Sequence, residues 1–208
     1  MTFHVPEELA LHHGGKDLLP GALKFAETFE VWGGMQKGMR VLDIGCGPGR
    51  MALGIGERFG WDTRYDGFDI KKADIDFCQS VLSKAHPSFQ FHHFDLFNDH
   101  YNKGGDTKAT DIRFPAEDKV VDFIFATSIY THFFVDDIRH YLAETARVCK
   151  GRSLSTWFLI DDRFEMARKA DTLRFDFPHQ AEDGTYYQHE KSPLDAVGHS
   201  LDSVKALH

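Results

Sequence analysis

The chain of 208 residues is long enough for one domain with a sizeable core, and its 42% apolar and 27% charged residues give an ordinary globular balance. A formal net charge of −8, with lysines and arginines only scattered, disfavours a protein that grips nucleic-acid phosphates. The three cysteines form no CxxC pair, which argues against a disulfide framework and a zinc site and suits a reducing cytoplasm. The sequence shows neither a signal-peptide pattern nor an apolar run of membrane-spanning length. We therefore expect a cytoplasmic protein that acts on a small molecule, with no metal, nucleic acid or membrane as partner.

In the first half of the chain, short apolar strands alternate with amphipathic segments, which predicts an α/β fold with a mainly parallel sheet. Pro20 and the glycine pair at 33–34 mark the start and the end of the first expected helix. The strand 40–44 then enters a glycine-rich turn, and the helix after it ends at Gly60. Further along we expect strands at 65–70 and 89–94 and, between them, a helix closed by Pro87 whose apolar face carries Phe77, Val81 and Ala85.

The second half begins with a polar stretch, 98–119, which is too long for an ordinary connection and predicts an excursion with a short helix of its own. An almost wholly apolar strand follows at 120–127. We expect Asp136 or Asp137 to cap the next helix, Gly151 to end it, and a fifth strand at 154–160. The last predicted element is a helix at 195–208, with Val197, Leu201 and Val204 as its apolar positions.

The most informative segment is Val41–Arg50, a strand that ends in a turn of the form G-x-G-x-G and leads into a helix. Its glycines allow the backbone to turn tightly and to approach a ligand. A strand, turn and helix of this kind mark a nucleotide-type site at the carboxyl end of a parallel sheet. The spacing departs from the G-x-G-x-x-G dinucleotide fingerprint, and Pro48 removes one N–H group that a pyrophosphate would use. Asp43 adds negative charge, which suits a ligand that carries an ammonium and a sulfonium.

Two further carboxylates stand at the ends of neighbouring strands. Asp69 ends the second strand, where it can accept hydrogen bonds from both hydroxyls of a ribose. Asp95 ends the third strand, where it can accept one from an adenine amino group. Each acid alone is equally well explained as a helix cap or a turn residue, but together with Asp43 and the glycine turn they fall along one edge of the expected sheet.

These residues resemble the motifs of class I S-adenosylmethionine-dependent methyltransferases. Val41–Arg50 is similar to the first motif, in the form V-L-D-x-G-C-G-x-G, and Asp69 matches the ribose-binding acid. Asp95-Leu96 matches the adenine-side motif, Thr127-Ser128 belongs to a segment similar to the fourth motif, and 144–151 is similar to the helix and turn before strand five. The resemblance spans roughly residues 41–160 and implies a Rossmann-like, doubly wound, mainly parallel sheet of order 3-2-1-4-5.

The resemblance also implies S-adenosylmethionine as the cofactor. Together with the acidic net charge, which favours a small-molecule partner, it predicts an enzyme that transfers a methyl group to an oxygen or nitrogen of a small-molecule acceptor. The predicted cofactor-binding residues are Asp43, Gly45, Cys46, Gly47, Gly49, Asp69, Ile70, Asp95, Leu96, Thr127 and Ser128. His132, four residues after Ser128, is the predicted catalytic base, because its intrinsic pKa suits proton transfer near neutral pH. Methyl transfer from a sulfonium is an in-line displacement that needs alignment and exclusion of water, a base when the nucleophile is a hydroxyl, and no metal.

We expect residues 1–208 to form one methyltransferase domain, with a helical N-terminal lid or cap (1–39), a cofactor-binding core (40–161) and a C-terminal substrate-side segment (162–208). The usual C-terminal strands six and seven are absent or incomplete in this sequence, so the strand 154–160 is expected to form an exposed apolar edge. The tail 172–188, a second copy of the chain in a homodimer, or residues beyond 208 in a longer parent protein are the candidates for covering it. We favour the last of these.

Two other functions are consistent with parts of the pattern. A non-catalytic S-adenosylmethionine-binding module is supported by the incomplete sheet. A nicotinamide-dependent oxidoreductase is disfavoured by the G-x-G-x-G spacing and by Pro48.

Overall fold

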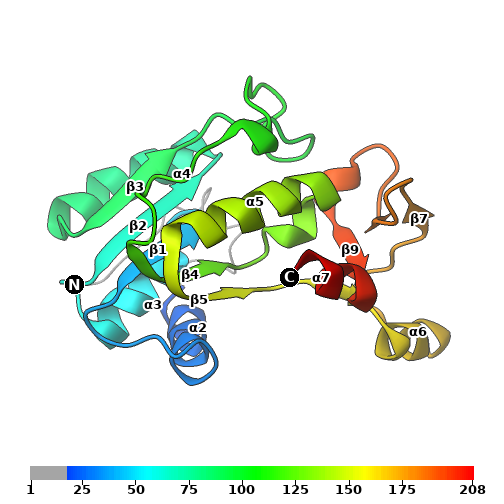
Figure 1. The fold of residues 1–208 in the computed structure, drawn as a ribbon, viewed down its shortest axis with the longest axis horizontal. Helices are drawn as coiled ribbons and strands as arrows, with labels where there is room; N and C mark the ends of the chain where they lie inside the picture. The colour runs from blue at the N-terminus through cyan, green and yellow to red at the C-terminus, as the bar shows by residue number, and fades with distance from the viewer. Residues whose placement is uncertain (1–17) are drawn as a thin grey trace. The chain divides into compact units, whose positions relative to one another are not determined.

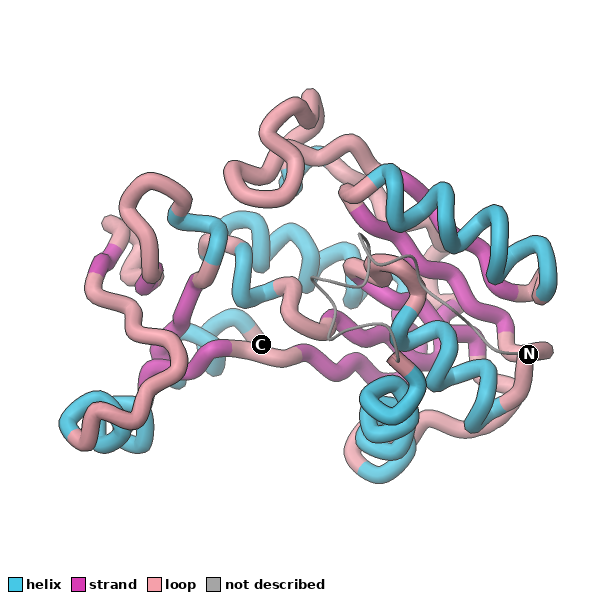
Figure 2. Tube along the Cα trace, turned by 180° about the vertical axis from the view of Figure 1, so that it is seen from behind, coloured by secondary structure: helices cyan, strands magenta, loops and turns pink. Residues whose placement is uncertain are grey.

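The computed structural model describes residues 18–208. The chain divides into two compact units. The first comprises the described part of residues 1–95 together with 113–125 and 145–154, and the second comprises 96–112, 126–144 and 155–208. Figures 1 and 2 show the helices and strands of both units. The prediction of one domain with boundaries at residues 39 and 161 stays a prediction, and the first 17 residues of the predicted lid lie outside the described residues.

A five-stranded sheet in the order β3-β2-β1-β4-β5 forms the frame of the first unit. Its strands are β1 (Arg40–Ile44), β2 (Arg64–Asp69), β3 (Phe89–His93), β4 (Val121–Ala126) and β5 (Cys149–Ser155). β1 pairs with β2, and β2 with β3, in parallel, so that Ile44 lies opposite Phe68 and Asp69 opposite His93. The predicted Rossmann-like fold and its strand order are confirmed, and this register brings the carboxyl ends of β1, β2 and β3 to one edge of the sheet.

The connecting helices follow the predicted sequence signals. They are α2 (Leu19–Val31), α3 (Arg50–Phe59), α4 (Lys72–Cys78), which continues as a π-helical turn (Gln79–Ser83), and α5 (Val135–Val148). Gly60 ends α3 with a φ of 107°, a conformation open to glycine. α2 packs closely on α3, because a Cβ atom on Gly54 would lie 2.3 Å from the backbone oxygen of Ala22. The described part of the segment 1–39 thus includes a helix, α2, that packs against the core with Ala22, Ala26 and Phe29 buried.

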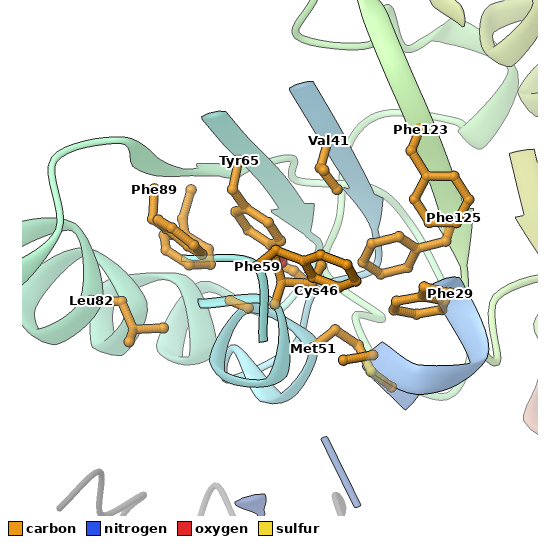
Figure 3. Packing of buried hydrophobic residues seen from close by; sticks show 14 of the residues in the cluster. Phe29, Val41, Cys46, Met51, Phe59, Tyr65, Leu82, Phe89, Phe123 and Phe125 are labelled. Atoms are coloured by element: carbon orange, nitrogen blue, oxygen red, sulfur yellow. The ribbon is translucent and has the colours of Figure 1, made fainter. Parts of the chain in front are cut away.

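Aromatic side chains fill the core between the sheet and these helices (Figure 3). Phe29 of α2 stacks on Phe125 of β4 with ring centroids 4.3 Å apart, and Tyr65 of β2 stacks on Phe89 of β3 at 4.9 Å. Burial of such rings stabilises the fold by about 2–3 kcal/mol each. The abundance of phenylalanine in the sequence therefore reflects an aromatic core.

The predicted apolar face of α4 and its π-helical turn is only partly confirmed: Phe77 packs against the core, but the rest of the face does not. Val81 is 40% exposed, whereas Ile75, Cys78 and Leu82 are buried. Both sets of residues have helical spacing, so the sequence offers two competing apolar stripes. The stripe that contacts the sheet is the one that packs beneath the glycine turn, where Leu82 and Cys78 approach Gly49.

The predicted fifth strand is also misplaced. The apolar run 154–160 is not one edge strand: β5 ends at Ser155, and a separate strand begins at Phe158. The backbone N–H of Thr156 donates to the oxygen of Ala126 at 3.1 Å, and this contact interrupts the run. The edge strand β5 instead carries Lys150, Gly151 and Arg152, and charged residues and glycines are the usual protection of an exposed edge.

The second unit is built around a small mixed sheet in the order β6-β9-β8-β7. Its strands are β6 (Phe158–Ile160), β7 (His179–Gln180), β8 (Tyr186–Tyr187) and β9 (Val197–Ser200). β9 pairs in parallel with β6 and antiparallel with β8. The tail therefore forms a hairpin of β7 and β8, and β8 pairs with β9 rather than with β5. Two short helices, α6 (Asp162–Lys169) and α7 (Leu201–Leu207), complete the unit together with 3-10 turns, one of which (Ala109–Asp111) is the short helix predicted for the polar excursion.

The predicted C-terminal helix is half wrong. A helix does form at its end, but α7 begins only at Leu201, capped by the Ser200 hydroxyl, which accepts from the N–H of Ser203 at 3.1 Å. Val197, predicted as a helical position, lies in β9. Pairing of β9 on both sides supplies more backbone hydrogen bonds than a first helical turn would, and this non-local gain is not visible in the local pattern.

The predicted cap of α5 is replaced by a residue from far along the chain. Asp136 and Asp137 lie within the first turn of α5, and the N–H of Val135 donates to the carboxylate of Asp183 at 3.3 Å. The same carboxylate accepts from the N–H of Thr185 at 2.9 Å, so it joins α5 to the β7–β8 hairpin.

Asp183→Ala is expected to lower the free energy of unfolding by about 1 kcal/mol, because it leaves the N–H of Val135 at the start of α5 and the N–H of Thr185 in the hairpin without their carboxylate acceptor. Asp136→Ala is the matched control, since Asp136 only forms a surface ion pair with Arg139. Chemical denaturation of the two variants measures the difference. Equal losses in both would show that Asp183 does not cap the helix.

Candidate cofactor site

The turn between β1 and α3 requires its glycines. Gly45, Gly47 and Gly49 have φ angles of 78°, 50° and 85°, in the left-handed region that favours glycine. A Cβ atom on Gly49 would lie 2.6 Å from Cδ1 of Leu82, so the turn also lies against the helix that follows β2. The three glycines of the motif are therefore required by the backbone conformation of the turn itself, independently of any ligand.

The backbone donors of this turn are already used within the protein. The N–H groups of Gly45 and Cys46 both donate to the oxygen of Phe68, at 2.9 and 3.0 Å, and the N–H of Gly49 donates to the oxygen of Cys46 at 3.1 Å. The N–H of Gly47 donates to the Asp69 carboxylate at 2.8 Å, and Pro48 has none. Residues 45–49, all described, thus retain no backbone donor for a pyrophosphate.

Asp69 holds the turn and the end of β2 together. One carboxylate oxygen accepts from the N–H of Gly47 and the other from the N–H of Lys71, at 2.8 and 2.9 Å. The side chain is half-buried at the carboxyl end of the strand. Because a carboxylate accepts about four hydrogen bonds, these two contacts are compatible with the predicted ribose contact and fix the carboxylate where that contact is expected.

Asp43 lies fully buried beneath the turn, in the last part of β1. The hydroxyl of Tyr65 donates to its Oδ2 atom at 2.5 Å, and its Oδ1 atom has no partner among the described residues. Burial raises the pKa of Asp43 to about 7; the Tyr65 hydrogen bond and Arg50 oppose this rise and the charge of Asp69 adds to it. At neutral pH the Asp43 carboxyl is therefore only partly ionised, so the negative charge predicted near the turn is only partly present.

The other predicted cofactor-binding residues at the ends of β1, β2 and β3 differ in their exposure and in the groups that they present. The Cys46 side chain is buried, and burial raises the pKa of its thiol well above the ordinary value. The thiol is therefore neutral and packed in the core. Ile70 follows β2, half-buried, and its backbone oxygen lies 3.2 Å from Nε2 of His93. Asp95 is exposed just beyond β3. The neighbouring Leu96, which belongs to the second unit, is buried, and its backbone oxygen accepts from the Asn102 amide at 2.9 Å.

Thr127 and Ser128 follow β4 and belong to the second unit. Thr127 is buried, whereas Ser128 is exposed and has a φ of 59°. A serine in the left-handed region is uncommon and often marks a functional position. Its N–H donates to the Thr156 hydroxyl at 2.7 Å, which fixes this conformation. The two residues predicted from the fourth motif thus lie in a strained, well-anchored turn.

His132 ends a 3-10 turn, η3 (Tyr130–His132), in the second unit. Its Nδ1 atom lies 2.9 Å from the oxygen of Leu194, and its Nε2 atom lies 3.5 Å from the hydroxyl of Tyr101. Burial lowers the pKa of His132, although Leu194 and Asp195 oppose this, so the ring is neutral near pH 7. A neutral imidazole is the form that a general base requires.

Sequence reasoning missed three residues that shape these sites. Tyr65 is the hydrogen-bond partner of Asp43, Thr156 anchors Ser128, and Tyr101 meets His132. Each partner lies more than 20 residues away in the sequence, so no local pattern signals the contact. For Tyr65 alone the sequence offers a local indication: the alternation of β2 places it on the same face as the buried Gly67, which predicts that Tyr65 points into the core.

No group of three or more histidine, cysteine, aspartate or glutamate side chains among residues 18–208 has the geometry to hold a metal ion. Among the same residues, no helix has both the length and the apolar character that crossing a membrane demands.

Comparison with known proteins identifies the family. The family model described as a methyltransferase domain matches residues 41–152, which is more than half of the chain. This chain belongs to the methyltransferase-domain family. The match begins at the first residue of the motif Val41–Arg50 and covers all five strands of the main sheet in whole or in part. The predicted class I family is confirmed, and the cofactor of that family is S-adenosylmethionine.

Solved structures of low sequence identity share the fold. The PH0226 protein of Pyrococcus horikoshii superposes with a TM-score of 0.59 and is 21% identical, over 88% of this chain and 78% of that one. The magnesium protoporphyrin IX methyltransferase of Synechocystis, solved with bound S-adenosylhomocysteine, has a TM-score of 0.54 and 14% identity, over 90% and 71%. A protein described as a putative S-adenosyl-L-methionine-dependent methyltransferase from Methanococcus maripaludis has a TM-score of 0.51 and 17% identity, over 76% and 65%.

A curated relative from Haemophilus influenzae, described as an uncharacterised protein, is 26% identical over 141 residues. That alignment covers 68% of this chain and 50% of the relative. The chain thus spans about half the length of this relative.

Proposed function

We propose that the chain binds S-adenosylmethionine at the turn Gly45–Gly49 and transfers the methyl group to an oxygen or nitrogen of a small-molecule acceptor. The observation that carries the proposal is the use of the turn's own donors: the N–H groups of residues 45–47 and 49 bind protein oxygens. Two acidic groups, Asp43 and Asp69, lie next to the turn, and the cation Arg50 follows it and interacts with Asp43. Such a turn repels a pyrophosphate and attracts a ligand with an ammonium and a sulfonium.

Each acidic group has a separate task in this proposal. Asp69, fixed by two backbone N–H groups, accepts hydrogen bonds from the ribose hydroxyls. Asp43, fully buried beneath the turn and bound through Oδ2 by the Tyr65 hydroxyl, supplies negative charge to the site. A cation bound above the turn favours the ionised carboxylate, so binding is expected to release part of the Asp43 proton.

When bound, S-adenosylmethionine supplies an electrophilic methyl group on a good leaving group. The protein's contribution is then to align the acceptor and to take up its proton. His132 is neutral, its Nδ1 side is engaged by Leu194, and its Nε2 side is left as the basic atom. For a hydroxyl acceptor we therefore propose His132 as the proton acceptor, a role worth about 10²- to 10⁴-fold in rate.

Binding and turnover test the proposed function separately. In calorimetry, S-adenosylhomocysteine is expected to bind about 100-fold or more tighter than NAD, which is a difference of about 2.7 kcal/mol. Turnover with S-adenosylmethionine and a panel of phenols and amines then distinguishes an enzyme from a non-catalytic binding module. Tighter binding of NAD would point to an oxidoreductase and overturn the proposal.

Asp69→Ala is expected to weaken S-adenosylhomocysteine binding by about 1–3 kcal/mol, since it removes the proposed ribose acceptor and the support of the Gly47 N–H. Calorimetry of the wild type and the variant gives the difference. Asp66→Ala on the same strand is the control, because Asp66 pairs with Arg40 and His92 instead of with the turn. Equal affinity of Asp69→Ala and the wild type would remove Asp69 from the site.

A further inference from the structure

A carboxyl group buried beneath the glycine turn uses only one of its two oxygens within the protein. Asp43 is fully buried in β1, and the Tyr65 hydroxyl donates to its Oδ2 atom at 2.5 Å. Its Oδ1 atom is buried as well and has no hydrogen-bond partner among residues 18–208. A neutral carboxyl group tolerates such a place, whereas an ionised one lacks the donors that it needs there. The charge of Asp43 is therefore sensitive to any further charge that enters this region.

The packing of β1 on β2 places the Asp43–Tyr65 pair directly against the turn. Asp43 lies opposite Gly67 in the register of the two strands. A Cβ atom on Gly67 would lie 2.9 Å from Cβ of Cys46, in the turn, and 3.0 Å from Cε1 of Tyr65. The space that this glycine leaves open thus accommodates both the tyrosine ring and the second residue of the turn (Figure 3). The pair therefore lies at the base of the proposed cofactor site.

The groups around Asp43 leave its ionisation balanced near neutral pH. Burial raises the pKa of Asp43 to about 7, and Asp69 adds to this rise, whereas the Tyr65 hydrogen bond and Arg50 oppose it. Burial also raises the pKa of Tyr65 well above its ordinary value, so Tyr65 keeps its proton and remains a donor. The other titratable groups at this place are Cys46 and Cys78, whose buried thiols are neutral because burial raises their pKa values, and the buried Asp74, which pairs with Lys71 at 3.6 Å.

The cofactor and its product differ by one positive charge. S-adenosylmethionine carries a sulfonium, whereas S-adenosylhomocysteine carries a neutral thioether, and the two molecules are otherwise alike except for the transferred methyl group. At an effective dielectric constant of about 20, a unit positive charge at about 10 Å lowers the pKa of a carboxyl group by about 1. The sulfonium therefore does not need to touch Asp43 to change its ionisation.

We propose that the Asp43–Tyr65 pair makes the site prefer the sulfonium cofactor to its thioether product, because Asp43 gives up its proton to solvent when the sulfonium binds and takes one back when a neutral sulfur replaces it. This rests on the proposed function. The ionised carboxylate attracts the sulfonium and finds no such charge on the product, so the product is held less tightly. Tyr65 is a positioning residue, which holds Oδ2 and so sets the pH at which the proton is exchanged.

Proton release by the wild type tests the proposal without any variant. Calorimetry at pH 7 in two buffers of different ionisation enthalpy, phosphate and Tris, gives the number of protons released on binding. S-adenosylmethionine is expected to release about 0.3–0.5 proton more than S-adenosylhomocysteine. Sinefungin, in which a protonated amine replaces the sulfonium, is expected to behave like S-adenosylmethionine. Equal release for all three ligands overturns the proposal.

The preference for the cofactor is expected to grow with pH. Binding of the sulfonium favours the ionised carboxylate, so the dissociation constant of S-adenosylhomocysteine divided by that of S-adenosylmethionine should rise about five- to tenfold between pH 5.5 and pH 7.5. Asp43→Asn cannot ionise and should abolish this rise. Asp66→Asn on β2, which alters a carboxylate that pairs with Arg40 and His92, is the matched control and should keep it. The same rise in Asp43→Asn as in the wild type overturns the proposal.

Tyr65→Phe tests the positioning role. The variant keeps an aromatic ring to stack on Phe89, where the centroids lie 4.9 Å apart, but it removes the donor to Oδ2. Without that donor the ionised form of Asp43 is less favoured, so the midpoint of the rise should move up by about half a pH unit or more, while the affinity for S-adenosylhomocysteine at pH 5.5 stays within about twofold. An unmoved midpoint overturns the positioning role of Tyr65. A wild type that binds both ligands with the same ratio at every pH overturns the discrimination, whereas one that binds neither overturns the proposed function itself.

Discussion

Gly47→Val is expected to reduce S-adenosylhomocysteine binding by more than about 100-fold, to below detection by calorimetry. Gly47 has a φ of 50°, and its N–H donates to Asp69. A β-branched residue strongly disfavours that conformation, at a cost of roughly 1–2 kcal/mol. The turn either moves, and breaks its contact with Asp69, or places an isopropyl group where the ligand approaches. Both outcomes remove the site, but the cost is smaller than the stability of a typical domain, so the fold is expected to persist.

Gly38→Val is the matched control for this substitution. Gly38 also has a left-handed φ, 85°, and a Cβ atom added there would meet nothing within 4 Å. It lies before β1, outside the turn, so the variant carries the same kind of backbone strain without touching the site. Circular dichroism should show both variants folded, and only Gly47→Val should lose binding. Loss of binding in both, or unfolding of Gly47→Val alone, would assign the glycine a structural role only.

The free energy of unfolding is expected to fall by up to roughly 4 kcal/mol, through Asp43, as the pH rises from about 4 to about 7. The pKa of Asp43 is about 7 in the folded protein and near its ordinary value of 3.8 when unfolded. Between these values the folded state holds a proton that the unfolded state has lost. The stabilisation is therefore complete below pH 4 and gone above pH 7.

Asp43→Asn isolates this contribution. The side chain still accepts from Tyr65, but it no longer titrates, so the variant's stability should depend less steeply on pH than that of the wild type. Denaturation at several pH values between 4.5 and 8.5 gives the two slopes. Other aspartates with lowered pKa values, such as Asp122, contribute in the opposite direction in both proteins and cancel in the difference. Parallel curves would contradict the buried, proton-holding Asp43.

The sequence predicts the cofactor half of the fold well because its signals there are local. The glycines of the turn, Gly60 at the end of α3 and the apolar strands each demand one conformation from a few neighbouring residues. The parallel order then follows from general rules of α/β connection, and the end of each strand fixes where Asp43 and Asp69 lie.

Elements whose conformation depends on distant partners escape such reasoning. The run 154–160 is split at Thr156 by a bond to Ala126, and Val197 joins a strand because β6 and β8 flank it. The cap of α5 comes from Asp183, 48 residues after the N–H that it accepts. The same holds for Tyr101 and His132, whose contact bridges 31 positions and could not be inferred from either neighbourhood.

Backbone amide NMR during titration with S-adenosylhomocysteine tests most directly whether the turn Gly45–Gly49 binds the cofactor. The N–H signals of Gly47, Gly49 and Asp69 are expected to shift together and to saturate at one dissociation constant, with no comparable response to NAD. Unchanged signals at these three residues while others shift, or shifts produced by NAD and not by S-adenosylhomocysteine, would contradict a cofactor site at the end of β1.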